Sequence, residues 1–192
     1  MGQIPFPNKK YQIILADPPW AYRDKALAGH RGAGCKYTTQ EASWLNDLPV
    51  RDIADVNCAL FLWVTMPKLN ECFTLIESWG FEYKTVAFTW VKRNKTANSW
   101  FWGMGRWTRA NAELCLLATK GKPKRIDAAV HSVIDTPIEQ HSKKPDKVRD
   151  KIVKLLGDLP RIELFARQRI EGWDSMGYGI DGMDIKGSLK RR

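Results

Sequence analysis

Three short apolar runs constrain the fold of this chain more than any other feature. They occupy residues 11–16, 59–64 and 161–166 and read YQIILA, ALFLWV and RIELFA. Strands that are buried on both faces of a sheet read as nearly continuous apolar runs. Residues 67–80 and 145–156 lie between these runs and carry apolar side chains at helical spacing. This alternation predicts an α/β fold with a mainly parallel, twisted sheet flanked by helices.

Weaker patterns complete the expected order of elements. Thr38 followed by Glu41 resembles a capping box, which predicts a helix over residues 38–47. Additional strands are expected at residues 81–91 and 113–119, with another near 129–134. The chain has 192 residues and no linker-like segment. We therefore expect a single domain over residues 1–192, with a frayed basic tail at about 182–192.

Positive charge and tryptophan are concentrated in one part of the chain. The net charge is +10, and residues 84–125 hold ten Lys or Arg residues but one acid, Glu113. We call residues 92–110 the basic aromatic loop. Cations neutralise phosphates and aromatic rings stack on bases, so this composition is typical of a nucleic-acid surface. The alternative is a solvated basic face over core tryptophans. The candidate contacts are Lys92, Arg93, Lys95, Trp100, Trp102, Arg106 and Arg109.

Other classes of protein find little support in the composition. The four cysteines form no CxxC pair and the three histidines are scattered, so neither a disulfide framework nor a metal site is expected. Apolar runs all fall well short of the roughly 20 residues that a membrane span needs. The amino terminus, MGQIPFPNKK, lacks the apolar segment of a secretory signal. These features predict an intracellular, cytoplasmic protein.

The first apolar run stops abruptly at Asp17, Pro18, Pro19 and Trp20. Proline lacks an N–H donor and fixes its own φ, so neither a strand nor a helix continues through the pair. A carboxylate and a rigidly held carbonyl are suited to the two N–H donors of an exocyclic amino group. They favour the positive charge that develops when that nitrogen attacks an electrophile. The alternative is a plain strand-terminating turn in which Trp20 fills the core.

Several segments resemble, in order, the Asp-Pro-Pro-Trp family of N6-adenine methyltransferases. The matching segments are YQIILADPPW, ALFLWVT, FTWVK, NAELCLLATKGKP, HSKKPD and RIELFAR. The resemblance implies a Rossmann-like methyltransferase fold and S-adenosylmethionine as the cofactor. It also implies the permuted motif order, in which the Asp-Pro-Pro-Trp element precedes the cofactor segment. The first apolar strand and the strand at residues 161–166 are then neighbours in the sheet.

The resemblance assigns roles to individual residues. Asp17 and the Pro18 carbonyl would hold the adenine amino group, with Pro19 for rigidity. Trp20 and Tyr22 would flank the base, and Tyr37 would lie on the substrate side. Lys144 would pair with the cofactor carboxylate, although Lys143 is adjacent and the register can slip by one. Glu163 would accept the ribose hydroxyls. The full expected cofactor set is Asp17, Ser142, Lys144, Glu163, Phe165 and Arg167.

Three functions remain open on the sequence. DNA is favoured as the substrate, because the chain is small and resembles phage-type members of the family. RNA is the alternative on the same scaffold, since recognition of the 2′-hydroxyl depends on geometry. A catalytically silent nucleic-acid-binding subunit is less favoured, because Asp17 and Trp20 are both present. Both a monomer and a homodimer are compatible with the sequence.

Overall fold

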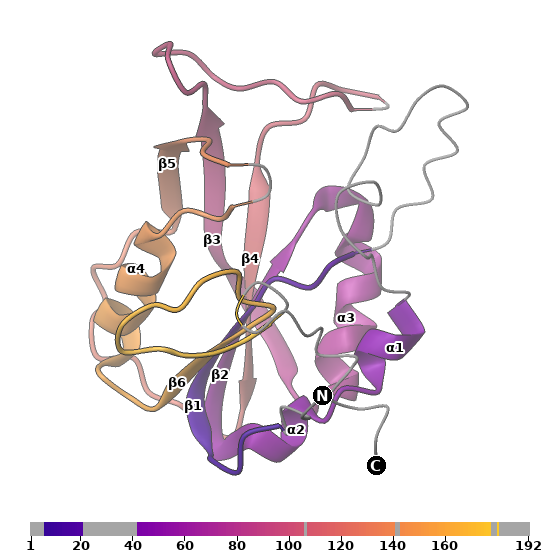
Figure 1. Cartoon of the computed structure of the whole chain (residues 1–192), viewed down its shortest axis with the longest axis vertical. Helices are drawn as coiled ribbons and strands as arrows, with labels where there is room; N and C mark the ends of the chain where they lie inside the picture. Colours follow the sequence, from indigo (N-terminus) through magenta and orange to yellow (C-terminus); the bar gives the residue numbers. More distant parts are fainter. Residues whose placement is uncertain (1–5, 21–41, 106, 141–142, 178–179, 181–192) are drawn as a thin grey trace.

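The structure is a computed structural model that describes residues 6–20, 42–105, 107–140, 143–177 and 180. Its centre is a sheet of seven strands in the order β5-β3-β4-β2-β1-β6-β7 (Figure 1). The strands are β1 (Tyr11–Ala16), β2 (Ala54–Val64), β3 (Glu82–Arg93), β4 (Glu113–Lys120), β5 (Val133–Pro137), β6 (Arg161–Leu164) and β7 (Asp174–Met176).

The middle of the sheet confirms the permuted strand order. β1 pairs in parallel with β2 on one side and with β6 on the other. Ala16, the last residue of β1, lies opposite Leu62 and Leu164. The residue after β1 therefore leaves the sheet between the ends of two neighbouring strands. That position is Asp17.

The sheet is mainly parallel, as predicted. β4 pairs antiparallel with β2 and with β3, whereas the other pairings among the described strands are parallel. All strands other than β4 therefore end at the same edge. Ligands of open α/β sheets bind beyond the carboxyl ends of the strands. We call this the carboxyl edge, and it holds the end of β1, the end of β3 and the start of β4.

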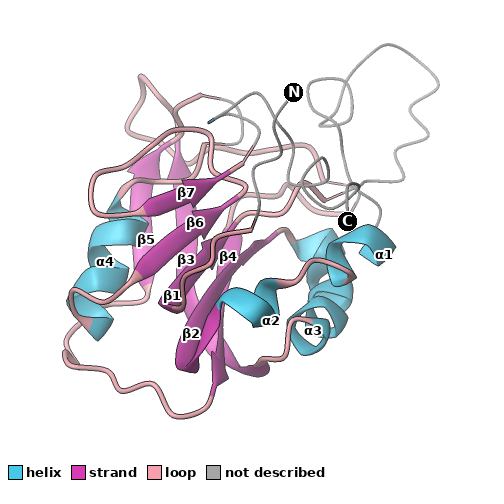
Figure 2. Ribbon diagram, turned by 60° about the horizontal axis from the view of Figure 1, so that its bottom comes forward, coloured by secondary structure: helices cyan, strands magenta, loops and turns pink. Residues whose placement is uncertain are grey.

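Helices cover both faces of the sheet and give a three-layer core (Figure 2). One face packs against α1 (Ala42–Asn46), α2 (Val50–Ile53) and α3 (Leu69–Ser78), with Trp79 fully buried among them. The other face packs against α4 (Lys147–Leu156), which buries Val148 and Ile152. The buried residues of α3 are Cys72, Leu75 and Ile76, which lie on one face of the helix. None of the helices among the described residues is long and apolar enough to span a membrane.

Some boundaries differ from the sequence expectations. The helix expected from residue 67 begins as a 3-10 turn, η2 (Met66–Lys68), before α3 starts. The fifth strand is β5 at Val133–Pro137 rather than near 129–134, and its alternating polar pattern suits its place at the sheet edge. β7 was not expected, since three residues reading DSM carry no apolar run. The helix expected at 38–47 is present as α1 at Ala42–Asn46, whereas residues 38–41 and the basic tail lie outside the described residues.

Candidate active site

The Asp-Pro-Pro-Trp element forms a tight turn at the carboxyl edge. The Trp20 backbone N–H donates to the Pro18 carbonyl over 2.9 Å, which closes a three-residue turn around Pro19. The φ that a proline ring imposes is close to that of the central residue of an inverse γ-turn. The prolines therefore end β1 and fix the direction of the Pro18 carbonyl, which retains one lone pair beyond the bond from Trp20.

Trp20 fastens this turn to the neighbouring strand. Its side chain is 5% exposed, and its indole N–H donates to the Trp63 carbonyl of β2 over 3.2 Å. Such burial agrees with the interpretation of Trp20 as a core residue. Stacking of Trp20 on a base stays a prediction.

Asp17 belongs to a chain of four side chains with alternating charge. We call these four the charge network: Asp17, Lys144, Glu113 and Lys92. Lys144 Nζ lies 2.8 Å from Asp17 Oδ2 and 3.3 Å from Glu113 Oε2. Lys92 Nζ lies 2.5 Å from Glu113 Oε1. All four side chains are largely buried. Two cations and two anions cancel, so the network places strong local charges in the interior without a net charge.

Burial and neighbouring charges have opposing effects on the pKa values of Asp17, Glu113 and Lys144. Burial raises the pKa of Asp17 above its usual value, and the positive charges of Lys144 and Arg167 oppose that rise. Burial also tends to raise the pKa of Glu113, but Lys144 and Lys92 outweigh it and lower that pKa. Burial tends to lower the pKa of Lys144, yet the carboxylates of Asp17 and Glu113 outweigh it and raise that pKa. Lys144 is therefore held as an ammonium ion.

The structure separates the two adjacent lysines. Lys144 points into the charge network. Lys143 instead pairs with Glu139 at 2.6 Å and with Asp146 at 2.8 Å, away from Asp17. Lys144 is thus the lysine of HSKKPD that reaches the site.

Glu163 of β6 is held by an arginine that the sequence did not single out. Arg149 of α4 donates from Nε and Nη2 to the two carboxylate oxygens of Glu163, over 2.8 and 2.9 Å. Arg149 also donates from Nη1 to Asp146 over 2.7 Å. An ionised carboxylate has about four lone-pair sites, so Glu163 retains acceptors for the predicted ribose hydroxyls.

The chain turns sharply where β6 ends. Phe165 has a φ of +62°, a left-handed conformation that is uncommon outside glycine. The Ala166 N–H donates to the Met176 carbonyl at the end of β7. A Cβ at Gly177 would lie 2.4 Å from the Ala166 carbonyl oxygen, so a side chain there would clash with backbone. The close approach leaves Phe165 half-buried at the carboxyl edge, next to the predicted cofactor position.

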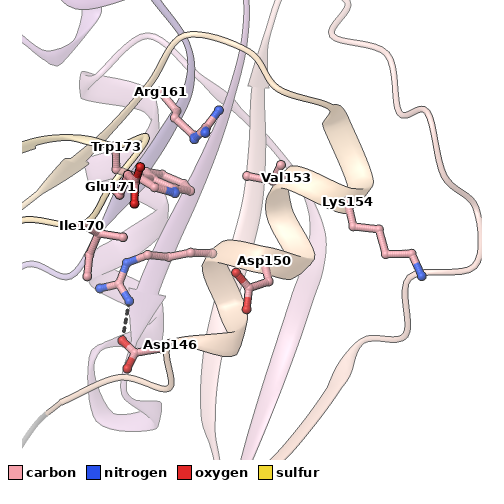
Figure 3. A pocket seen from close by; sticks show the side chains of 9 residues that line it. Asp146, Asp150, Val153, Lys154, Arg161, Ile170, Glu171 and Trp173 are labelled. Carbon is pink, nitrogen blue, oxygen red and sulfur yellow. Dashed lines mark hydrogen bonds and ion pairs between the residues drawn. The ribbon is translucent and has the colours of Figure 1, made fainter.

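A cavity of about 510 Å³ lies between α4 and the segment before β7 (Figure 3). Trp173 and Ile170 face Val153 of the helix across it. The cavity is also lined by three acids and three cations, Asp146, Asp150, Glu171, Arg149, Lys154 and Arg161. Of the expected cofactor residues that the structure describes, none lines this cavity. Arg149 connects it to Glu163, so the cavity adjoins the candidate site without containing it.

The cations at the base of the basic aromatic loop make internal contacts. Lys92 belongs to the charge network. Arg93 donates from Nε and Nη2 to Asp135 of β5, each over 2.6 Å, and its guanidinium lies 4.5 Å from the Trp100 ring centroid. Trp90 is buried, in line with the alternative reading of core tryptophans. Farther out, Lys95, Trp100, Trp102 and Arg109 are exposed.

Four expected site residues, Tyr22, Tyr37, Arg106 and Ser142, lie outside the described residues. Sequence reasoning missed the roles of Glu113 and Arg149. Glu113 carried a signal, because it is the one acid in a strongly basic stretch. Arg149 carried none, since cations on amphipathic helices are usually solvated. Among the described residues, no group of His, Cys, Asp and Glu side chains is placed to hold a metal ion.

Known proteins match most of this chain. The MT-A70 family profile matches residues 11–179. The Type II methyltransferase M.MunI of Mycoplasma sp is 38% identical over 198 residues, covering 94% of this chain and 82% of M.MunI. The human N(6)-adenosine-methyltransferase catalytic subunit METTL3 is 30% identical over 183 residues, covering 92% of this chain and 29% of METTL3. The chain therefore belongs to the MT-A70 family, a family of methyltransferases.

Proposed function

We propose that this protein transfers a methyl group from S-adenosylmethionine to the N6 amino group of adenine in DNA. The observation that carries the proposal is the pairing of Asp17 with Lys144 over 2.8 Å at the carboxyl edge. It brings together an acceptor for an amino group and a cation for the cofactor's carboxylate. Family membership and the two named relatives support the same reaction class.

Asp17 and Pro18 suit the amino group of an adenine. One N–H donates to the Asp17 carboxylate and the other to the remaining lone pair of the Pro18 carbonyl. In the transfer this nitrogen would bond to the methyl carbon while the bond from that carbon to the sulfonium sulfur breaks, leaving a neutral thioether. Positive charge would pass to the nitrogen, and a nearby carboxylate would stabilise it. The extra proton then leaves to solvent. Asp17 therefore acts mainly on the transition state rather than on ground-state binding.

Lys144 and Glu163 suit the two ends of the cofactor. When bound, S-adenosylmethionine supplies a methyl group activated by its sulfonium. A lysine ammonium has three N–H donors. Lys144 pairs with Asp17 and Glu113, and its Nζ lies 5.7 Å from the centroid of the Trp63 ring. The third N–H is then directed to the cofactor carboxylate. Glu163, oriented by Arg149, accepts the ribose hydroxyls with its remaining lone pairs.

We favour DNA over RNA as the substrate. The relative that matches with higher identity, and over most of its own length, is named a Type II methyltransferase. The similarity to METTL3, which is named for adenosine, makes RNA the second candidate. The chain spans less than a third of METTL3, so that protein's activity carries less weight here. We place the reaction inside the cell, where both cofactor and DNA are present.

The proposal is tested by methyl transfer from labelled S-adenosylmethionine to a DNA duplex, a DNA single strand and an RNA of the same sequence. Mass spectrometry of the released nucleosides identifies the methylated position. We expect N6-methyladenine in DNA, and much less in RNA. Methylation confined to RNA would assign the second candidate. Binding without methylation of any of the three would leave a silent nucleic-acid-binding subunit.

A further inference from the structure

The basic aromatic loop is a braced arm rather than a loose connection. At the end of β3 an isolated bridge pairs Arg93 with Trp100, and farther along the arm another pairs Gly103 with Ala110. The Asn111 side chain donates to the carbonyls of Lys92 and Phe101 and accepts from the Lys92 N–H. Figure 1 shows this arm extending beyond the ends of β3 and β4. The base of the arm is thus fixed to the sheet.

The tip of the arm presents apolar side chains to solvent. A Cβ at Gly105 would lie 1.9 Å from the Thr108 carbonyl oxygen, so the turn closes only with glycine at that position. Met104, directly before Gly105, is 89% exposed, and Trp107, directly before Thr108, is 98% exposed. Trp102, lower on the arm, is 60% exposed. Exposed groups of large apolar side chains of this kind mark interaction sites.

The charge around these side chains indicates the kind of partner. Residues 92–110 contain five Lys or Arg residues and no acid. The exposed cations of the arm among the described residues are Lys95 and Arg109. A partner that matches both features has a negatively charged backbone and flat apolar surfaces. Stacked base pairs between phosphate chains have both.

The arm stands on the same edge of the sheet as Asp17. β3 leads into the arm and β4 leads out of it, at the edge where β1 ends. Lys92 at the base of the arm contacts Glu113, and Lys144 connects Glu113 to Asp17. A nucleic acid bound to the arm would therefore approach the edge of the sheet that holds Asp17.

We propose that Met104 and Trp107 form a wedge that enters the base stack of duplex DNA beside the target adenine. An adenine inside a duplex is paired and stacked, so its amino group reaches Asp17 only after extrusion. Apolar side chains that insert between base steps unstack them and take over the stacking contacts. This inference rests on the proposed function and adds a role in substrate preparation.

The wedge is tested by single-turnover methylation of three DNAs by Trp107→Ala and Met104→Ala. The substrates are a duplex with a paired adenine, a duplex with adenine opposite an abasic site, and a single strand. Aromatic stacking on a base implies a loss of about ten- to a hundredfold for Trp107→Ala on the paired duplex. We expect a much smaller loss opposite the abasic site, none on the single strand, and recovery with Trp107→Phe. The matched control is Ile126→Ala, which truncates a side chain that is 71% exposed and lies outside the arm.

A second measurement needs no methylation. Fluorescence of 2-aminopurine at the target position rises when the base leaves the stack, and Trp107→Ala should reduce this rise at saturating DNA. If the wild-type protein raises the 2-aminopurine fluorescence but transfers no methyl group, the proposed function is overturned while the wedge still stands. The wedge would be overturned if Trp107→Ala lost methylation rate equally on all three substrates. It would also be overturned if Trp107→Ala left the rise in 2-aminopurine fluorescence unchanged. Sedimentation showing that Trp107→Ala turns a dimer into a monomer would overturn it as well, since the tip would then join two copies of this chain.

Discussion

Lys144 Nζ lies 2.8 Å from Asp17 Oδ2, although the two residues are 127 positions apart in the chain. The contact joins the turn after β1 to the segment before α4. It gives the candidate site a cation and an anion in direct contact within a largely buried position. Each of the two charges has its own expected effect when removed.

Lys144→Ala should weaken S-adenosylmethionine binding far more than Lys143→Ala does. Loss of one charge-assisted hydrogen bond costs about 1.5–3 kcal/mol, or roughly ten- to a hundredfold in affinity. Lys143 is the matched control, because its contacts are with Glu139 and Asp146. Isothermal titration calorimetry measures both variants. Equal affinity of the two variants for the cofactor would remove Lys144 from the cofactor site.

Asp17→Ala should nearly abolish methyl transfer while nucleic-acid binding persists. The carboxylate stabilises charge on the reacting nitrogen, and such contacts typically contribute about a hundredfold or more to the rate. Asp17→Asn should retain part of the activity, because its amide oxygen still accepts one hydrogen bond. Single-turnover rates and a filter-binding assay separate these effects. Full activity of Asp17→Ala would reduce the Asp-Pro-Pro-Trp element to a turn.

The acid limb of the pH–rate profile should lie above the ordinary aspartate value of about 4, because burial raises the pKa of Asp17. Asp17 accepts a hydrogen bond only when ionised, so activity falls as the pH falls through its pKa. Glu113→Gln should move this limb to lower pH, since the negative charge of Glu113 contributes to raising that pKa. Rates at saturating cofactor test the shift, with the more exposed Glu139→Gln as control. If Glu113→Gln moved the acid limb to higher pH, the negative charge of Glu113 would not be raising the pKa of Asp17.

Asp17 and Glu113 contribute to the free energy of unfolding in opposite pH ranges. Because the folded-state pKa of Asp17 is raised, its contribution is full at low pH and is lost as the pH rises through that pKa. The lowered pKa of Glu113 gives a contribution that is present above its unfolded value and is lost as the pH falls through the folded value. Urea unfolding should therefore show that the free energy of unfolding falls more for the wild type than for Glu113→Gln when the pH is lowered from about 7 to about 3.

Arg149→Met should lower the free energy of unfolding by about 3–5 kcal/mol, because it leaves the Glu163 carboxylate buried without its cation. The double change Arg149→Met with Glu163→Gln should recover part of this loss. Lys154→Met is the control, since Lys154 is exposed and its contact with Asp127 spans 3.7 Å. Urea denaturation measures all three. A loss below 1 kcal/mol for Arg149→Met would show that the pair is solvated in solution.

Local chemistry explains which parts of this molecule were predictable. The segments β1, β2 and β6 consist largely of apolar residues, and this composition alone predicts buried strands. The parallel pairing at the centre of the sheet followed from the same pattern. The Asp-Pro-Pro-Trp stop is also local, since proline ends strands wherever it occurs. Pairings between distant segments are not local. The Arg149–Glu163 pair and the contact of Lys92 with Glu113 depend on strand order and register, which single residues do not encode.

Trp20→Ala tests an expected site residue that the structure buries in the core. Removing a buried tryptophan costs about 3–5 kcal/mol of stability, and the Trp63 carbonyl also loses its donor. Trp20→Phe should cost much less, because most of the packing remains. We expect urea denaturation to show this order of stability.

The rates of the Trp20 variants then distinguish packing from stacking. If Trp20 acts by holding the turn after β1, its truncation moves Asp17 for every substrate alike. Single-turnover rates of folded Trp20→Ala should therefore fall by a similar factor on a paired duplex, a mismatched duplex and a single strand. Stacking on an extruded base predicts a different pattern, because its worth of about 1–3 kcal/mol offsets the cost of extrusion. A loss confined to the paired duplex would place the Trp20 ring against the base and require it to leave its contact with Trp63.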